Sequence, residues 1–239
     1  MDQYYNVAGL NLLMDCTGRT FEQAIPYRCD PFDCADITLS SETIMQYADR
    51  ISPQFPGISE DQLHYLSTGA LFYRDLLSYD GMMLHASAVI MDNQAYLFTA
   101  DSGTGKSTHT SLWLQVFHDQ AAILNDDKPA IRLENGKWYA YGTPWSGKHN
   151  ISQNQRAVIA GVAVLQRSEH NEITQLNDFD AVYPILKQVN RPPSAEHRGK
   201  VMELLDSLIT TVPVWKLKCN MNPDAALVAY QAMSQGGKL

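Results

Sequence analysis

A single loop, Ala100–Thr108, constrains this chain more than any other stretch of its sequence. It reads Ala-Asp-Ser-Gly-Thr-Gly-Lys-Ser-Thr and lies between an apolar, strand-like run, Ala95–Thr99, and a helix-like run, Lys106–Phe117. A strand followed by a tight loop and a helix N-terminus directs backbone N–H groups and the positive end of the helix dipole at one point. The sequence therefore predicts a phosphate-binding loop at this position.

Residue types within the loop match the chemistry of a bound phosphate. Glycines permit the turns that bring N–H groups round an anion, a lysine can reach the outer phosphates, and a serine hydroxyl can ligate Mg²⁺. Ala100 replaces the first glycine of the pattern G-x-x-x-x-G-K-[ST], which alanine tolerates where its φ is negative. The other interpretation is a Gly/Ser turn that happens to contain a lysine. The predicted nucleotide contacts are Asp101, Ser102, Gly103, Thr104, Gly105, Lys106, Ser107 and Thr108.

The strand that enters the loop is predicted to be the second arm of a hairpin. Met83–Met91 and Ala95–Thr99 are two apolar runs joined by a short polar turn. This arrangement differs from the opening strand of a parallel βαβ unit. His85 lies on the first arm, where strand pairing could bring it near the loop. A satisfied core histidine is the alternative interpretation for a lone histidine on a strand.

Two adjacent carboxylates follow the next apolar run. Ala121–Leu124 predicts a short buried strand that ends in Asn125, Asp126 and Asp127. Carboxylates at a strand end near a phosphate loop can hold Mg²⁺ and can accept the proton of an attacking hydroxyl. Ser107, Asp126 and Asp127 are therefore the candidate metal residues, and the two aspartates are also catalytic candidates. An Asx-type turn is the alternative interpretation.

Three residues further along the chain carry weaker signals. Lys148 lies in a loop rich in hydrogen-bond donors and could meet a phosphate. In the same loop, Trp145 could stack on a substrate or pack beneath the loop. Arg156 precedes the strand-like run Val158–Leu165 and is expected at the edge of the same sheet. Spacing alone would not select Arg156 from other surface arginines.

Composition limits the classes of partner. The formal net charge of −8, with no basic run to offset it, argues against nucleic acid or an anionic membrane. Cys16, Cys29, Cys34 and Cys219 have no C-x-x-C spacing and are too few for a disulfide framework. No signal-peptide pattern opens the chain and no apolar run has the length of a membrane span, so the cytoplasm is the expected location.

The chain is predicted to have two parts. Residues 1–80 form a small β-rich region with a helix capped by Ser59, and they offer a surface for a substrate or partner. Residues 81–239 contain every candidate described above and form the catalytic domain. Strands and helices interleave without a repeat, which predicts an α/β (α+β) fold with a mixed sheet.

Taken together, His85, the loop, the aspartate pair and Arg156 resemble the catalytic domain of HPr kinase/phosphorylase. That domain belongs with phosphoenolpyruvate carboxykinase in a class whose phosphate loop follows a β-hairpin. The likeness spans about residues 80–170. It implies that His85 lies beside the transferred phosphate, that one aspartate is the base while the other helps to hold the metal, and that Arg156 steadies phosphate charge. It leaves open which aspartate has which role.

The two ends of the chain depart from that family. The separate N-terminal domain of the bifunctional bacterial enzyme and the helices that grip its carrier protein are not recognisable, so HPr is not the expected acceptor. Carboxykinase chemistry is not expected either, because no Lys/His pair matches its transition-metal site. The pattern is similar to shorter HPr-kinase-like proteins that phosphorylate free serine or the serine of a ribosomally made peptide.

The predicted function is a kinase that uses ATP and Mg²⁺ to phosphorylate a serine-type hydroxyl on a peptide, a protein or a small molecule. Lys106 would hold the phosphates, and Arg156, with Lys148, would offset transition-state charge. Two alternatives remain open: a nucleotide-binding regulatory module, and a phosphorylase that uses His85. ATP, GTP or pyrophosphate could be the donor, and related enzymes often form homo-oligomers.

Overall fold

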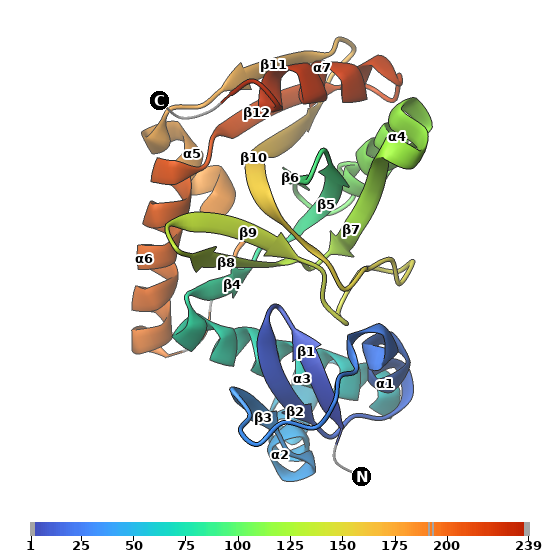
Figure 1. Ribbon diagram of the computed structural model, residues 1–239, viewed down its shortest axis with the longest axis vertical. Helices are drawn as coiled ribbons and strands as arrows, with labels where there is room; N and C mark the ends of the chain where they lie inside the picture. Colours follow the sequence, from blue (N-terminus) through green and yellow to red (C-terminus); the bar gives the residue numbers. More distant parts are fainter. Residues whose placement is uncertain (1–2, 191, 193, 237–239) are drawn as a thin grey trace.

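The computed structural model describes residues 3–190, 192 and 194–236, and it contains two sheets (Figure 1). The smaller sheet has the order β1-β2-β3, in which β1 and β2 are antiparallel while β2 and β3 are parallel. Helices α1, α2 and α3 pack around it in the lower part of Figure 1. The bounds are β1 Tyr4–Val7, β2 Leu10–Met14, β3 Ile37–Leu39, α1 Gly18–Ala24, α2 Ser41–Ile51 and α3 Glu60–Asp75.

Local sequence explains these elements. Side chains of β1 and β2 alternate between buried and half-buried positions, as expected for strands with one face against a core. The Ser40 hydroxyl caps α2 by accepting a hydrogen bond from the Thr43 N–H. The predicted Ser59 cap does the same for α3 through the Gln62 N–H. The β-rich layer predicted for the N-terminal part thus also contains α1 and α2.

The larger sheet has nine strands and is curled. It contains both parallel and antiparallel pairs, so the predicted mixed sheet is confirmed. Its main path is β4-β8-β9-β10-β6-β5-β7; β12 also pairs with β10, and β11 pairs with β12. The bounds are β4 Gly81–Met83, β5 Ala86–Met91, β6 Gln94–Thr99, β7 Ala121–Asp127, β8 Ala130–Glu134, β9 Lys137–Tyr141, β10 Arg156–Arg167, β11 Glu172–Gln175 and β12 Val214–Cys219.

The pairing around β6 decides where the loop lies. β5 and β6 are antiparallel, with Ala86 opposite Thr99, so the predicted hairpin is confirmed. β10 is parallel to β6 on its other side, with Val158 opposite Gln94 and Val164 opposite Thr99. The phosphate loop therefore follows the carboxyl end of β6 and lies beside the carboxyl end of β10.

Helices cover both faces of the larger sheet. On β6, Tyr96 and Phe98 belong to the cluster formed with α4 and α7, whereas Ala95 and Leu97 belong to the cluster formed with α5 and α6. This alternation, typical of a strand buried on both faces, makes β6 a central strand. The bounds of these helices are α4 Lys106–Phe117, α5 Asp178–Leu186, α6 Ala195–Thr211 and α7 Asp224–Met233.

Trp145 joins the two sheets. Its ring is fully buried, stacks on Phe72 of α3 with 4.8 Å between ring centroids, and donates from Nε1 to the Thr68 hydroxyl at 3.1 Å. Burying so large a ring contributes about 1.5–3 kcal/mol. Of the two predicted roles for Trp145, packing is the one observed, and it fixes α3 against the end of β7. Within the described residues, no helix is both long and apolar enough to cross a membrane.

Candidate functional site

The predicted loop forms an open cradle at the start of α4. Gly103 has a φ of +77° and Gly105 a φ of +122°, and no atom lies within 4 Å of the position that a Cβ on Gly103 would occupy. Such angles favour glycine and turn the loop N–H groups to one side. Ala100 is buried and is not among the described non-glycine residues with positive φ, so its replacement of glycine causes no strain.

Lys106 begins α4 and lies under the loop. Its side chain is 9% exposed, and its ammonium donates to the Ala100 carbonyl at 3.3 Å. Burial lowers the pKa of Lys106, while nearby Asp127 and Asp126 oppose that shift. The ammonium is therefore held in the cradle by one neutral carbonyl, and a phosphate oxygen could replace that contact.

Asp126 joins the loop to β7. The Ser107 hydroxyl lies 3.0 Å from each Asp126 carboxylate oxygen, and the Ser87 hydroxyl donates to the same carboxylate. Asp126 itself is 4% exposed. A buried carboxylate in contact with the serine that follows the loop lysine matches the two protein ligands that magnesium takes in phosphate-loop enzymes.

Asp127 differs from its neighbour in every contact. Its Oδ1 lies 2.9 Å from His85 Nε2, and its Oδ2 lies 3.7 Å from the Lys128 ammonium. Burial acts to raise the pKa of Asp127, but the hydrogen bond and charge of His85, with Lys128 and Lys106, outweigh it and lower that pKa. Asp127 also has a φ of +103°, a strained angle for a non-glycine residue. The arrangement keeps this half-exposed carboxylate ionised and paired with His85 and Lys128, whereas Ser107 contacts Asp126.

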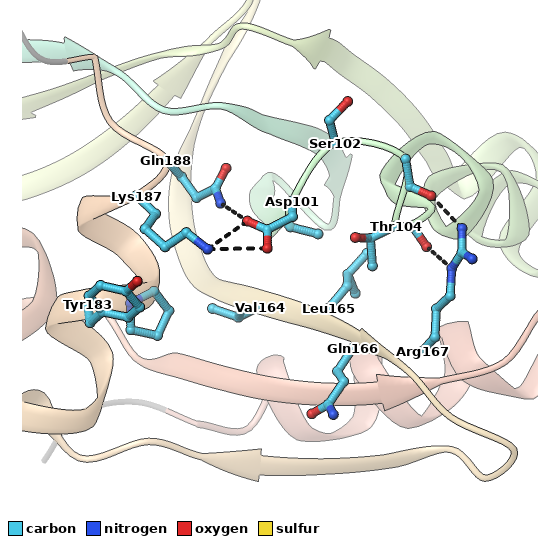
Figure 2. Close-up of a pocket in the computed structure, with 13 residues that line it drawn as sticks. Asp101, Ser102, Thr104, Val164, Leu165, Gln166, Arg167, Tyr183, Lys187 and Gln188 are labelled. Atoms are coloured by element: carbon cyan, nitrogen blue, oxygen red, sulfur yellow. Dashed lines mark hydrogen bonds and ion pairs between the residues drawn. The ribbon is translucent and has the colours of Figure 1, made fainter.

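A second layer of contacts supports His85 and the loop. His85 Nδ1 lies 3.0 Å from Gln188 Oε1. The Gln188 amide in turn reaches Asp101 at 3.4 Å (Figure 2). Asp101 also pairs with the Lys187 ammonium at 3.0 Å. The segment that follows α5 therefore fixes both the histidine ring and the first turn of the loop.

The two ends of β10 carry different arginines. Arg167, at the carboxyl end, donates from Nε to the Thr104 carbonyl at 3.1 Å and from Nη2 to the Gly103 carbonyl (Figure 2). Arg156, at the amino end, pairs with Glu134 at 2.7 Å and bonds the Tyr141 hydroxyl. The structure does not bring Arg156 to the loop, because the parallel pairing with β6 sends the opposite end of β10 there. This corrects the expectation, implied by the family resemblance, that Arg156 meets the phosphate at the loop.

Lys148 lies on the other side of the aspartates. It is exposed and lines a cavity of about 320 Å³ together with Asp127 and Lys128. Gly147 donates its N–H to the Asp126 carbonyl at 2.5 Å, and a Cβ there would lie 3.2 Å from the Asp127 Cβ. The close approach of this loop to β7 places Lys148 near Asp127, at a cavity other than those that flank the phosphate loop.

Two further cavities flank the loop. One of about 590 Å³ lies between the loop, β10 and α5, and includes Tyr183 and Lys187 (Figure 2). The other, of about 470 Å³, has a largely apolar lining that includes Leu112, Leu165 and Met221. Both have the size of small-molecule sites. Arg167 lines both, so it stands between them.

The residues present fit both groups that the sequence implies. The cradle at Gly103 and Gly105 has room for a phosphate, and Lys106 supplies its charge. Magnesium uses one or two carboxylates plus substrate phosphates rather than a full protein cage. Accordingly, in the described residues no cluster of three or more His, Cys, Asp or Glu side chains could hold a metal ion, whereas Ser107 and Asp126 offer oxygen ligands.

The chain matches no protein-family model and no curated protein. Among solved structures it is similar to the Hpr(Ser) kinase/phosphatase from Coxiella burnetii, with 13% sequence identity and a TM-score of 0.35. The match covers 62% of this chain and 91% of that one. At this TM-score the likeness transfers no activity.

Several residues of the site carried no sequence signal. Ser87 and Arg167 contact the aspartate and the loop, yet each lies in an ordinary strand pattern. Arg19 and Tyr65 line the cavity beside Asp127 but belong to the N-terminal part of the chain. Lys128 directly follows the aspartate pair, and that adjacency was the one available signal for it.

Proposed function

We propose that this chain is a kinase that uses ATP and Mg²⁺ to phosphorylate a serine-type hydroxyl on a small molecule, a peptide or a protein, with a fold of the HPr kinase-like class. The observation that carries the proposal is the difference in contacts between the two adjacent carboxylates. Asp126 is in contact with Ser107, whereas Asp127 is paired with His85 and faces a separate cavity. A nucleotide-binding module without catalysis has no use for the second carboxylate.

The geometry supports a distinct role for each residue. Loop N–H groups and Lys106 bind the phosphates, and Ser107 and Asp126 hold the metal. When held there, magnesium would supply positive charge to the phosphates. Asp127 accepts the proton of the acceptor hydroxyl. The oxygen of that hydroxyl then forms a bond to the γ-phosphorus, while the bond from the γ-phosphorus to the ADP oxygen breaks. His85 keeps Asp127 ionised and oriented.

Exchanging each aspartate for asparagine tests this assignment. We expect Asp127→Asn to lower kcat by roughly 10²–10⁴-fold with ATP affinity unchanged, because only the proton acceptor is lost. Asp126→Asn should instead raise the magnesium concentration needed for half-maximal activity. Asp119→Asn, at an exposed position beyond the far end of α4, is the matched control. Mass spectrometry of candidate acceptors measures the gain of one phosphoryl group, and ATP titration measures binding.

Full phosphoryl transfer by Asp127→Asn would show that Asp127 is not the base. Absence of transfer by the wild-type protein to any hydroxyl acceptor, with ATP bound, would overturn the kinase itself.

A further inference from the structure

The cavity beside Asp127 has an unusual charge for this protein. Three cations, Arg19, Lys128 and Lys148, and one carboxylate, Asp127, line it. The cavity therefore has an excess of two positive charges in a chain whose formal net charge is −8. Its other walls come from α3 and the loop after β9. The N-terminal part thus supplies one wall of a cavity whose other wall holds the proposed base.

The guanidinium of Arg19 has no carboxylate partner in the part of the chain that the structure describes, but other contacts hold it in place. Its Nη2 donates to Asn150 Oδ1 at 2.7 Å and to the Gly147 carbonyl at 3.2 Å, and its guanidinium lies 4.0 Å from the centre of the Tyr65 ring. Asp61 accepts from the backbone N–H of Arg19, not from its guanidinium. Arg19 Nε is buried and has no hydrogen-bond partner among the described residues. The Arg19 guanidinium thus brings to the cavity a positive charge that no carboxylate of the described residues neutralises by direct pairing.

Lys128 brings a second cation to the same ring. Its ammonium lies 5.6 Å from the Tyr65 ring centre. The two cations therefore repel each other across the cavity, and one carboxylate at 3.7 Å compensates them only in part.

A buried hydroxyl on the same wall also lacks a partner. Ser146 is 1% exposed and lines the cavity, and its Oγ has no hydrogen-bond partner among the described residues. Buried polar groups normally have one, because leaving a donor unpaired costs about 1–3 kcal/mol. Ser146 and Arg19 are thus two independent unpaired donors at one cavity.

We infer that the acceptor is a small hydroxyl compound that carries an anionic group, a carboxylate or a phosphate ester, bound between Arg19 and Lys128 with its hydroxyl at Asp127. The volume of about 320 Å³ is at the lower end of the range for small-molecule sites, which fits a compact acceptor. This inference rests on the proposed kinase function for the role of Asp127, but the anion site itself stands on the cavity.

Binding measurements with three compounds of one carbon skeleton test the inference. Glycerate, glycerol 3-phosphate and glycerol are titrated calorimetrically into the wild-type protein saturated with ADP and Mg²⁺, so that the phosphate loop is already filled. We expect at least one anion to bind roughly 10-fold or more tightly than glycerol, because charge-assisted hydrogen bonds replace neutral ones. The preferred anion distinguishes a carboxylate from a phosphate ester.

Variants assign the binding to the cavity. Arg19→Gln and Lys128→Gln should each weaken binding of the preferred anion by roughly 10-fold, and Arg19→Lys should restore part of it. Arg50→Gln is the matched control, because Arg50 is exposed on α2 and also lies over a tyrosine, 4.7 Å from the Tyr47 ring centre. It should bind like the wild type.

Equal binding of glycerol and both anions, no binding of either anion, or anion binding that both cavity variants retain would each overturn the inference. Phosphoryl transfer is measured separately on the same compounds. Anion binding that depends on Arg19, with no transfer to any of the three compounds, would confirm the anion site and reject these three compounds as acceptors.

Discussion

The phosphate loop and the cavity beside Asp127 meet at adjacent residues but are assembled in opposite ways. The loop is one continuous stretch whose cradle, lysine and serine all lie within Ala100–Thr108. The cavity gathers side chains from segments as distant as Arg19 and Lys148, and Arg19 is in direct contact with Asn150, 131 residues further along the chain. Local geometry therefore determines the half that would bind a nucleotide, whereas tertiary packing determines the half that would select an acceptor.

The largest expected effect tests the continuous half. Lys106→Met should lower kcat/KM for phosphoryl transfer by roughly 10³-fold, because it removes the cation under the loop that meets developing phosphate charge. Lys137→Met, at an exposed position on β9, is the control and should retain full activity. Steady-state kinetics with the preferred acceptor measure both. A Lys106 variant within 10-fold of the wild type would mean that the loop does not carry the chemistry.

A smaller effect, confined to acidic pH, tests the junction between the two halves. Asp127 must be ionised to accept a proton, so activity falls as pH drops through its pKa. His85 lowers that pKa below its ordinary value of 3.8 and burial opposes it. In His85→Ala the effect of burial on Asp127 is less opposed, so the pKa of Asp127 rises. The acid limb of the kcat/KM profile therefore moves to higher pH.

The measurement is a pH profile for the wild type, His85→Ala and His149→Ala, the last at an exposed histidine. Only the His85 variant should shift. An acid limb that stays in place would exclude Asp127 as the base that His85 keeps ionised.

Sequence reasoning succeeded where chemistry depends on neighbours in the chain. The loop, the hairpin that enters it and the strand that ends at the aspartates could all be predicted, because turn glycines, a helix start and apolar runs are local signals. The division of roles between Asp126 and Asp127 could not, because it depends on which partner each carboxylate meets. His85 is brought to Asp127 by the pairing of β5 with β7, whereas Ser107 reaches Asp126 from the start of α4.

Arg19 and Arg156 show the limits of sequence reasoning in both directions. No spacing rule points to Arg19, because its place at the cavity depends on contacts with Tyr65 and with the loop after β9. Arg156 was selected by its place in the strand order, but its place along the strand decides which end of the sheet it reaches. Register is a tertiary property, and the pairing of Val164 with Thr99 fixes it here.

The smallest expected effects compare the two arginines of β10. Arg167→Gln should raise the KM for ATP by roughly 3- to 10-fold, because two hydrogen bonds to loop carbonyls are lost at a partly solvated site. Arg156→Gln should change KM and kcat by less than about twofold. Its ion pair with Glu134 is half-exposed, with 53% of the arginine side chain accessible, so unfolding free energy should fall by only about 0.2–1 kcal/mol.

Kinetics and urea unfolding of the two variants show which end of β10 affects nucleotide use. The strand order is the same for both arginines, so only their position along the strand differs. If Arg167 is the residue that matters, the carboxyl end of β10 belongs to the nucleotide half, as its register with β6 requires. A large kinetic defect in Arg156→Gln with Arg167→Gln unaffected would reverse that conclusion. It would then place phosphate contacts at the amino end of the strand, where Glu134 and Tyr141 now hold the arginine.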